Sequence, residues 1–333
     1  MNSDFTKGEE GVGWVEMFDS AIPLLDTSNS DRETLQKELI ELKSKFFNYD
    51  EAYVANACFE ERRKVLDRAY NECKPFLDDG FLNEVSRPGK FMDRLWELAL
   101  CSILLHKGYT LEKWVKTNKP RPDFCVLLNG KKVWVEATCP DLGDVDSVAP
   151  PPILVPGVIH TETIDIAKDI RPRALRASSA LSKKFAKRKD YLSGGHMNEE
   201  DAYIIAINTH RITRHADSML EELVLYGMGL HQINVRTGES WREWKPETFK
   251  KGEVGEVPVT MAYFLRPEYK TISGVIFHSK WFEFDSDWKN SLADSATIYF
   301  NEDTKVPLVK GEFSFGKRKY MEIIGNQGIL REL

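Results

Sequence analysis

The dipeptide Asn129-Gly130 constrains the fold of this 333-residue chain more than any other local feature. It separates two runs, 122–128 and 131–138, that are rich in residues favouring β-strands. Asn-Gly between two such runs favours a two-residue turn of type I′, because both of its residues tolerate positive φ. The sequence therefore predicts an antiparallel β-hairpin centred on this dipeptide.

The turn also sets the register of the two strands. If Leu128 opposes Lys131, counting outward along both strands brings Asp123 opposite Glu136. Directly opposed residues have Cβ atoms about 4.5 to 5.5 Å apart, so the two carboxylates repel unless a cation lies between them. Oxygen ligands without His or Cys favour Mg²⁺ or Mn²⁺ over zinc. The hairpin is therefore a candidate metal site, and the alternative is a solvent-facing edge hairpin with ordinary surface acids.

Alternation along the second strand of the hairpin divides its side chains between two faces. We expect the apolar face to pack against the core and the other face to carry the chemistry. The apolar face holds Val133, Val135 and Ala137, and the other holds Lys132, Trp134, Glu136 and Thr138.

The composition is that of a folded protein without disulfide bonds. Hydrophobic residues make up 42% of the chain and charged residues 29%, which suffices for one large domain or two modest ones. The five cysteines are scattered without CxxC spacing, which argues against both a disulfide framework and a zinc site. No apolar run approaches the roughly 18 to 20 residues of a membrane span. We therefore expect a cytoplasmic protein that does not bind membranes.

The spacing of apolar residues predicts two regions. Residues 1–88 are typical of a helical N-terminal region, and residues 89–333 of an α/β domain with C-terminal elaborations. In the second region a helix, three strands, a second helix and a fourth strand follow one another, which predicts a mixed β-sheet flanked by helices. The predicted helices are 30–46, 51–73, 91–106, 165–191 and 218–226, and the predicted strands are 109–115, 122–128, 131–138, 202–208, 272–277 and 296–300, with a hairpin or loop around Trp241 and Trp244.

Glu97 is a third acid of interest, because its helix is apolar almost all round. Burying a carboxylate on such a helix is costly unless the carboxylate is paired or bound to a metal. We therefore expect Glu97 to join the acids of the hairpin, and Asp93, one turn earlier, could share this role. The alternative is a surface ion pair between Glu97 and Arg94.

Positive charge is concentrated between residues 168 and 189, although the formal net charge of the chain is -6. Such a concentration is typical of a surface that contacts the phosphate backbone of nucleic acid without sequence preference. The alternative is a solvated helix face balanced by acidic neighbours. The residues that we expect to contact nucleic acid are Lys168, Arg171, Arg173, Arg176, Lys183, Lys187 and Arg188. Lys184 and Lys189 complete the set of basic residues in this segment.

The order and spacing of Glu97, Pro122-Asp123 and Glu136 resemble the PD-(D/E)xK nuclease superfamily, which has the restriction-endonuclease-like fold. The resemblance covers roughly residues 90–210. It implies that Asp123 and Glu136 bind a catalytic metal ion and that the backbone carbonyl of Ala137 completes its shell. Glu97 would then ligate a second ion or orient a water molecule.

The sequence departs from the motif of this superfamily at one position. The resemblance implies a lysine two residues after the second acid, where this chain has Thr138. A lysine cation positions the attacking water and stabilises charge on the phosphate, whereas threonine carries no charge. We expect Lys184 of the basic helix to replace the missing lysine, and Lys132 is a weaker substitute.

These features predict a Mg²⁺- or Mn²⁺-dependent endonuclease that hydrolyses phosphodiester bonds, with DNA as the favoured substrate. The alternative is a catalytically inactive module with a nuclease fold that binds nucleic acid or a protein partner. A structural protein with surface acids is a third reading. The sequence leaves open whether the chain forms a homo-oligomer.

Overall fold

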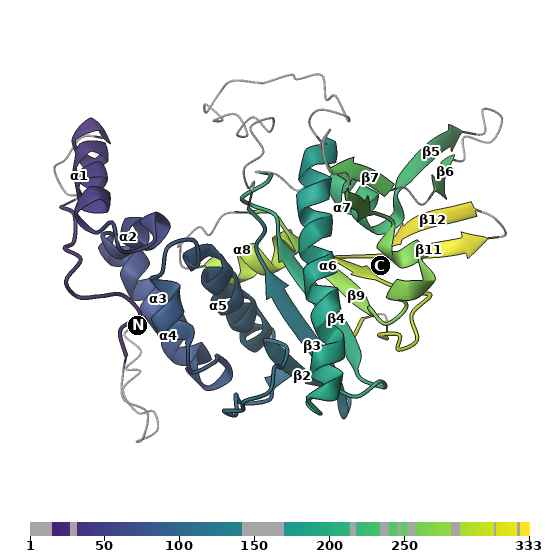
Figure 1. Ribbon diagram of the computed structural model, residues 1–333, viewed down its shortest axis with the longest axis horizontal. Helices are drawn as coiled ribbons and strands as arrows, with labels where there is room; N and C mark the ends of the chain where they lie inside the picture. Colours follow the sequence, from purple (N-terminus) through teal and green to yellow (C-terminus); the bar gives the residue numbers. More distant parts are fainter. Residues whose placement is uncertain are drawn as a thin grey trace, which may run out of the picture. The chain divides into compact units, whose positions relative to one another are not determined.

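The computed structural model describes residues 15–26, 32–141, 170–213, 218–233, 240–245, 248–251, 257–280, 287–309, 311–324 and 327–333 (Figure 1). The chain divides into two compact units, one made of residues 1–75 and 79–94 and the other of residues 76–78 and 95–333. None of the helices in the described ranges is long and apolar enough to cross a membrane.

Helices dominate the first half of the described chain, and strands dominate the second half. The helices are α1 (Arg32–Lys45), α2 (Glu51–Ala57), α3 (Glu60–Cys73), α4 (Phe81–Val85), α5 (Phe91–His106), α6 (Arg171–Ser193), α7 (Ser218–Tyr226) and α8 (Trp288–Ser295). The strands are β1 (Thr110–Leu111), β2 (Phe124–Leu128), β3 (Lys131–Thr138), β4 (Ala202–Asn208), β5 (Met228–Ile233), β6 (Ser240–Lys245), β7 (Thr248–Lys251), β8 (Val257–Thr260), β9 (Gly274–His278), β10 (Thr297–Phe300), β11 (Lys317–Ile324) and β12 (Gln327–Glu332).

The first unit is helical, as predicted, but the expected helix 51–73 is divided into α2 and α3. Asp50 caps the start of α2 by accepting hydrogen bonds from two backbone N–H groups. The helix stops because the carbonyl of Cys58 accepts a hydrogen bond from the N–H of Leu25 at 2.8 Å, and Phe59 is extended. A contact from a distant segment thus interrupts a run that local spacing predicts as one helix.

The second unit is a mixed α/β structure. Its sheet has the strand order β1-β2-β3-β4-β9-β10-β11-β12, and the β5–β6 hairpin joins the β12 end through one residue pair, Gly328 and Arg242. Strands β3, β4 and β9 are parallel to one another, whereas β2 is antiparallel to β3. The predicted mixed sheet is therefore confirmed, and β3 and β4 are internal strands rather than edge strands.

The turn between β2 and β3 has the predicted geometry. Asn129 and Gly130 both have positive φ, 49° and 78°, as a type I′ turn requires. Leu128 pairs with Lys131, and the ladder continues outward in the predicted register.

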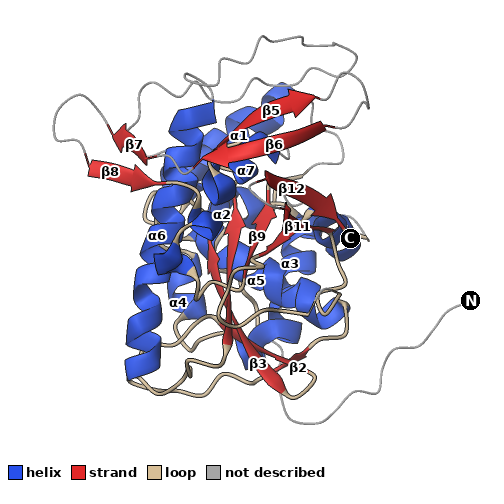
Figure 2. Ribbon diagram, turned by 90° about the vertical axis from the view of Figure 1, so that its right-hand side faces the viewer, coloured by secondary structure: helices blue, strands red, loops and turns tan. Residues whose placement is uncertain are grey.

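Helix α6 covers one face of the sheet (Figure 2). Ala174, Ala177 and Leu181 of this helix are buried in one hydrophobic cluster with Trp134 of β3 and Tyr203 of β4. The small alanine side chains let the helix backbone approach the strands closely. As a result, longer side chains on the neighbouring stripe of α6 reach the end of β3.

Helix α5 packs against the opposite face. Phe277 of β9 belongs to the α6 cluster, so the next residue, His278, points the other way. The ring of Trp96 from α5 stacks on His278 with 5.2 Å between centroids. The indole N–H of Trp96 donates to the carbonyl of Ala206 at 3.0 Å. The helix that carries Glu97 is thus attached directly to the central strands.

Several predicted elements agree with the structure to the residue, among them helices 91–106 and 218–226 and strand 202–208. The strand expected at 109–115 is shorter, because its pairing with β2 ends at Leu111 and the following residues 113–120 are mostly exposed. Among the α-helices and strands of the described residues, those not predicted are α4, α8, β7, β8, β11 and β12.

Candidate active site

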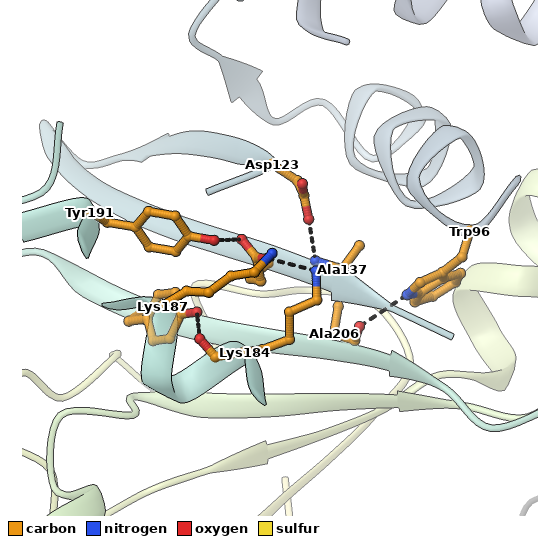
Figure 3. Close-up of polar contacts among 9 residues, drawn as sticks. Trp96, Asp123, Ala137, Lys184, Lys187, Tyr191 and Ala206 are labelled. Atoms are coloured by element: carbon orange, nitrogen blue, oxygen red, sulfur yellow. Dashed lines mark hydrogen bonds and ion pairs between the residues drawn. The ribbon is translucent and has the colours of Figure 1, made fainter. Parts of the chain in front are cut away.

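Asp123 lies where the pairing of β2 with β3 ends. The last paired residues are Phe124 and Val135, so Asp123 and Glu136 stand opposite each other one position further along, as the register predicts. The Oδ2 atom of Asp123 accepts a hydrogen bond of 2.7 Å from the backbone N–H of Ala137 (Figure 3). This bond attaches the carboxylate to the strand that carries Glu136.

Glu136 is buried, with 1% of its surface exposed, and it accepts hydrogen bonds from three side chains of α6. The ammonium of Lys184 lies 2.6 Å from Oε1, and that of Lys187 lies 3.4 Å from the same oxygen. The hydroxyl of Tyr191 donates to Oε2 at 2.9 Å. These donors converge because they are three and four residues apart on one stripe of the helix (Figure 3). The solvent-facing reading of the hairpin is therefore wrong for Glu136.

The two carboxylates are close enough to influence each other electrostatically. Burial, and then the negative charge of Glu136, raise the pKa of Asp123 to about 6, against the opposing effect of Lys184 and Lys187. The hairpin thus holds Asp123 in a position where its ionised form is disfavoured. A further positive charge at this position would favour that form.

Lys184 remains charged although it is largely buried. Burial disfavours its ammonium form, but the carboxylates of Asp123 and Glu136 outweigh burial and raise the pKa of Lys184 above its ordinary value. Glu97 adds a smaller effect in the same direction. The three predicted acids therefore all act on the ammonium that was expected to replace the motif lysine.

Glu97 lies on α5 and is half-buried. Arg94, its alternative partner, lies against Glu84: its Nε atom is 3.2 Å from Oε2 of that residue. The role of Glu97 as a metal ligand or water-orienting group stays a prediction.

Thr138, at the position of the motif lysine, is the last residue of β3 and is half-buried. Lys132, the weaker substitute, forms an ion pair of 2.8 Å with Glu112 and lies over the ring of Trp134. Of the two lysines considered as replacements, Lys184 is the one whose ammonium reaches Glu136.

The expectation that one face of β3 packs and the other carries chemistry needs a correction. Trp134 and Glu136 are as well buried as Val133 and Val135. The reason is that α6 covers the second face of β3, where Trp134 is buried in one cluster with Ala177 and Leu181 of this helix. The polar site is thus a small polar region at the end of a packed face.

The pair of carboxylates fits a hard divalent ion such as Mg²⁺. Within the described residues, no three His, Cys, Asp or Glu side chains are arranged to hold a metal. Mg²⁺ does not require such a group, because it commonly keeps several waters and binds through one or two carboxylates. The Oδ1 atom of Asp123 accepts no hydrogen bond from the described residues. A cation would also relieve the repulsion that raises the pKa of Asp123.

The basic residues of α6 do not all face solvent. Arg188 is 6% exposed and pairs with Glu199 at 3.0 Å. Arg176 donates to the carbonyl of Asp141 at 2.7 Å and contacts its carboxylate. Both charges are thus already used within the fold, so these two residues are weaker candidates for phosphate contacts than predicted.

Lys183 and Lys187 are exposed, and Arg173 is half-buried. At about 100° per residue, Arg173, Lys183 and Lys187 fall within about 80° of one another around the axis of α6, so they share one side of the helix. Arg171 begins α6, and Lys168 lies outside the described residues.

Sequence reasoning assigned Lys187 to nucleic-acid binding and gave Tyr191 no chemical role. The structure places both against Glu136. Their spacing from Lys184 on one helix was the available signal, but it identifies a common stripe and not the residue that the stripe faces. That residue depends on how α6 crosses the sheet.

No protein-family model, curated protein or solved structure matches this chain.

Proposed function

We propose that this protein is a metal-dependent endonuclease that hydrolyses phosphodiester bonds of nucleic acid, with DNA as the favoured substrate. The observation that carries the proposal is the contact of 2.6 Å between the Lys184 ammonium and Glu136, beside the opposed carboxylate of Asp123. Two acids and a lysine thus meet at one point, although the lysine comes from α6 and not from β3.

The order of elements supports a restriction-endonuclease-like core. An acid on α5, an acid before β2 and an acid on β3 follow one another, which is the order that the resembled superfamily uses. Helix α6 then supplies the cation before the chain enters β4. These elements carry the whole proposed site.

Asp123 and Glu136, with the carbonyl of Ala137, would hold a Mg²⁺ or Mn²⁺ ion. When bound, this ion supplies a water of lowered pKa and positive charge near the phosphate. Lys184 would position the attacking water and stabilise negative charge on the phosphate, because its raised pKa keeps it protonated. Glu97 would orient a second water or ligate a second ion.

Two cations of α6, the exposed Lys183 and the half-buried Arg173, would guide the nucleic-acid backbone towards this point. Lys183 lies beside Lys184, and Arg173 lies ten residues before Lys183 on the same side of the helix, about 15 Å away along its axis. Contacts of this kind give affinity without sequence preference.

Incubation of supercoiled plasmid with the protein and Mg²⁺ or Mn²⁺ tests the proposal. We expect metal-dependent nicking by the wild type and losses of at least about a hundredfold in Asp123→Asn, Glu136→Gln and Lys184→Met. Lys189→Met is the matched control, because Lys189 is exposed and lies two positions after Lys187, on another side of α6. Equal activity in all variants would show that the cleavage does not come from this site.

One observation favours the non-catalytic alternative. Glu136 already has two ammonium groups and one hydroxyl as partners. The negative charge of its carboxylate is therefore compensated without a metal ion. A module that binds nucleic acid would show binding that persists in Asp123→Asn and no cleavage by the wild type. The same plasmid experiment, combined with a gel-shift measurement, separates the two functions.

A further inference from the structure

Two ammonium groups reach the same oxygen of Glu136, but they are held differently. Lys184 lies 2.6 Å from Oε1, and its side chain is 18% exposed. Lys187 lies 3.4 Å from Oε1, and its side chain is 52% exposed. Because the contact of Lys187 is longer and more open to solvent, it is the donor that Glu136 loses more easily.

The carboxylate has little free capacity while both lysines are in place. Each carboxylate oxygen offers about two lone-pair positions. Lys184 and Lys187 take both positions at Oε1, and Tyr191 takes one at Oε2. A cation that binds Glu136 through Oε1 must therefore displace a donor.

The charges lead to the same conclusion. Asp123 and Glu136 carry two negative charges, and Lys184 and Lys187 balance them. A divalent cation adds two positive charges, which repel any ammonium that remains within a few ångströms. Lys184 is held at the site by three acids, whereas Lys187 can move into solvent.

We infer that Lys187 is a built-in competitor for the metal ion: its ammonium occupies a position at Glu136 in the metal-free protein and leaves when a divalent cation binds. The inference rests on the proposed metal site, and it adds a residue that weakens metal binding. Lys187 would thus set the metal concentration at which the site is occupied.

Calorimetric titration of the protein with MgCl₂ or MnCl₂, without nucleic acid, tests this inference. We expect Lys187→Met to bind the ion about tenfold more tightly than the wild type, because one competing positive charge is gone. Lys187→Arg keeps the charge and should bind like the wild type. Lys189→Met removes a charge elsewhere on α6 and should also leave the affinity unchanged.

Each outcome has a distinct meaning. Binding by Lys187→Met alone, or binding tighter than that of the wild type and of both controls, supports the inference. Equal or weaker binding by Lys187→Met overturns it but leaves the proposed metal site in place. Binding by none of the four proteins overturns the inference together with the metal-dependent function. Equal tightening in Lys189→Met would indicate a general charge effect and would also overturn it.

Discussion

At the residue scale, the buried carboxylate of Glu136 requires neighbouring side chains that offset the cost of burying its charge. An isolated carboxylate with 1% exposure would be strongly destabilising, and here two ammonium groups and a phenol offset that cost. Removing one partner of a buried pair leaves the charge of the other partner uncompensated, which strongly lowers the stability of the fold. Substitutions around Glu136 should therefore affect stability as well as activity.

Asp123→Asn should stabilise the metal-free protein at neutral pH. The pKa of Asp123 is raised from 3.8 to about 6, so its contribution to stability is present below about pH 4 and is lost as the pH rises through about 6. Above that pH the ionised carboxylate destabilises the fold, and asparagine removes this charge while its oxygen can still accept from Ala137. We expect a gain on the order of 1 kcal/mol at about pH 7.5 and little change at about pH 4.

Urea unfolding of wild type and Asp123→Asn at both pH values, in the presence of a chelator, measures this difference. A variant that is less stable than the wild type at the higher pH would contradict the conclusion that the ionised carboxylate of Asp123 destabilises the fold.

Tyr191→Phe should destabilise the protein by about 1 to 2 kcal/mol, because the change leaves a buried oxygen of Glu136 without its donor. A Glu136→Gln background should reduce this loss, because the two side chains are in contact. Tyr203→Phe is the matched control, since the Tyr203 hydroxyl donates to the backbone carbonyl of Lys184. Equal coupling of both tyrosines to Glu136 in double-mutant cycles would argue against a specific role for Tyr191.

At the scale of elements, a glycine in the β2–β3 turn and a glycine directly before β11 are required for different reasons. Gly130 and Gly316 both have positive φ, 78° and 67°. A Cβ at Gly130 would meet no atom within 4 Å, whereas a Cβ at Gly316 would lie 2.4 Å from the carbonyl oxygen of Ala296. The first site thus requires only a backbone conformation, and the second also requires empty space.

Gly130→Ala should lower the free energy of unfolding by about 1 kcal/mol, the cost of left-handed backbone for alanine. Gly316→Ala should cost several times more, because backbone must move to relieve the clash. Denaturant unfolding of the two variants gives the comparison. Equal losses would show that the approach of Ala296 does not constrain the β10–β11 region.

The side of α6 that carries the exposed Lys183 leads to a prediction about nucleic-acid affinity. Lys183→Gln should weaken binding to duplex DNA about equally for different sequences and reduce the slope of log affinity against log salt by about 1. Lys189→Gln, with the same change of charge on another side of the helix, should leave the slope unchanged. Fluorescence anisotropy over a range of salt concentrations measures the affinity and the slope for each variant. Identical slopes in the two variants would argue against a specific role of Lys183 in DNA binding.

For the whole molecule, a metal ion that binds only the folded state must raise the apparent stability. At tenfold excess over its dissociation constant, Mg²⁺ or Mn²⁺ should stabilise the wild type by about 1.4 kcal/mol, which is a rise of about 2 °C in the unfolding temperature. Asp123→Asn should abolish the rise. Thermal denaturation with NaCl at matched ionic strength provides the control, and an equal rise in the variant would place the bound metal elsewhere.

The sequence by itself determined the features that depend on local conformation. Asn129 and Gly130 tolerate positive φ, so they specify the turn, and the turn specifies that Asp123 opposes Glu136. The apolar run of α5 also identified a buried helix, which ends at His106, two residues before Gly108 with φ 81°. Strand β11 was missed because three of its first four residues are Lys or Arg, which hides the pattern of a strand.

The family resemblance pointed to Lys184, but only the tertiary structure decided that Lys184, Lys187 and Tyr191 together surround Glu136. Lys184 is 48 residues away along the chain, and it reaches Glu136 because β3 and β4 are parallel and α6 connects them across one face of the sheet. A lysine two residues after the acid would have come from β3 itself, and local spacing would have revealed it. When the cation comes from another element, its position follows from helix packing, which depends on long-range contacts that a local pattern does not contain.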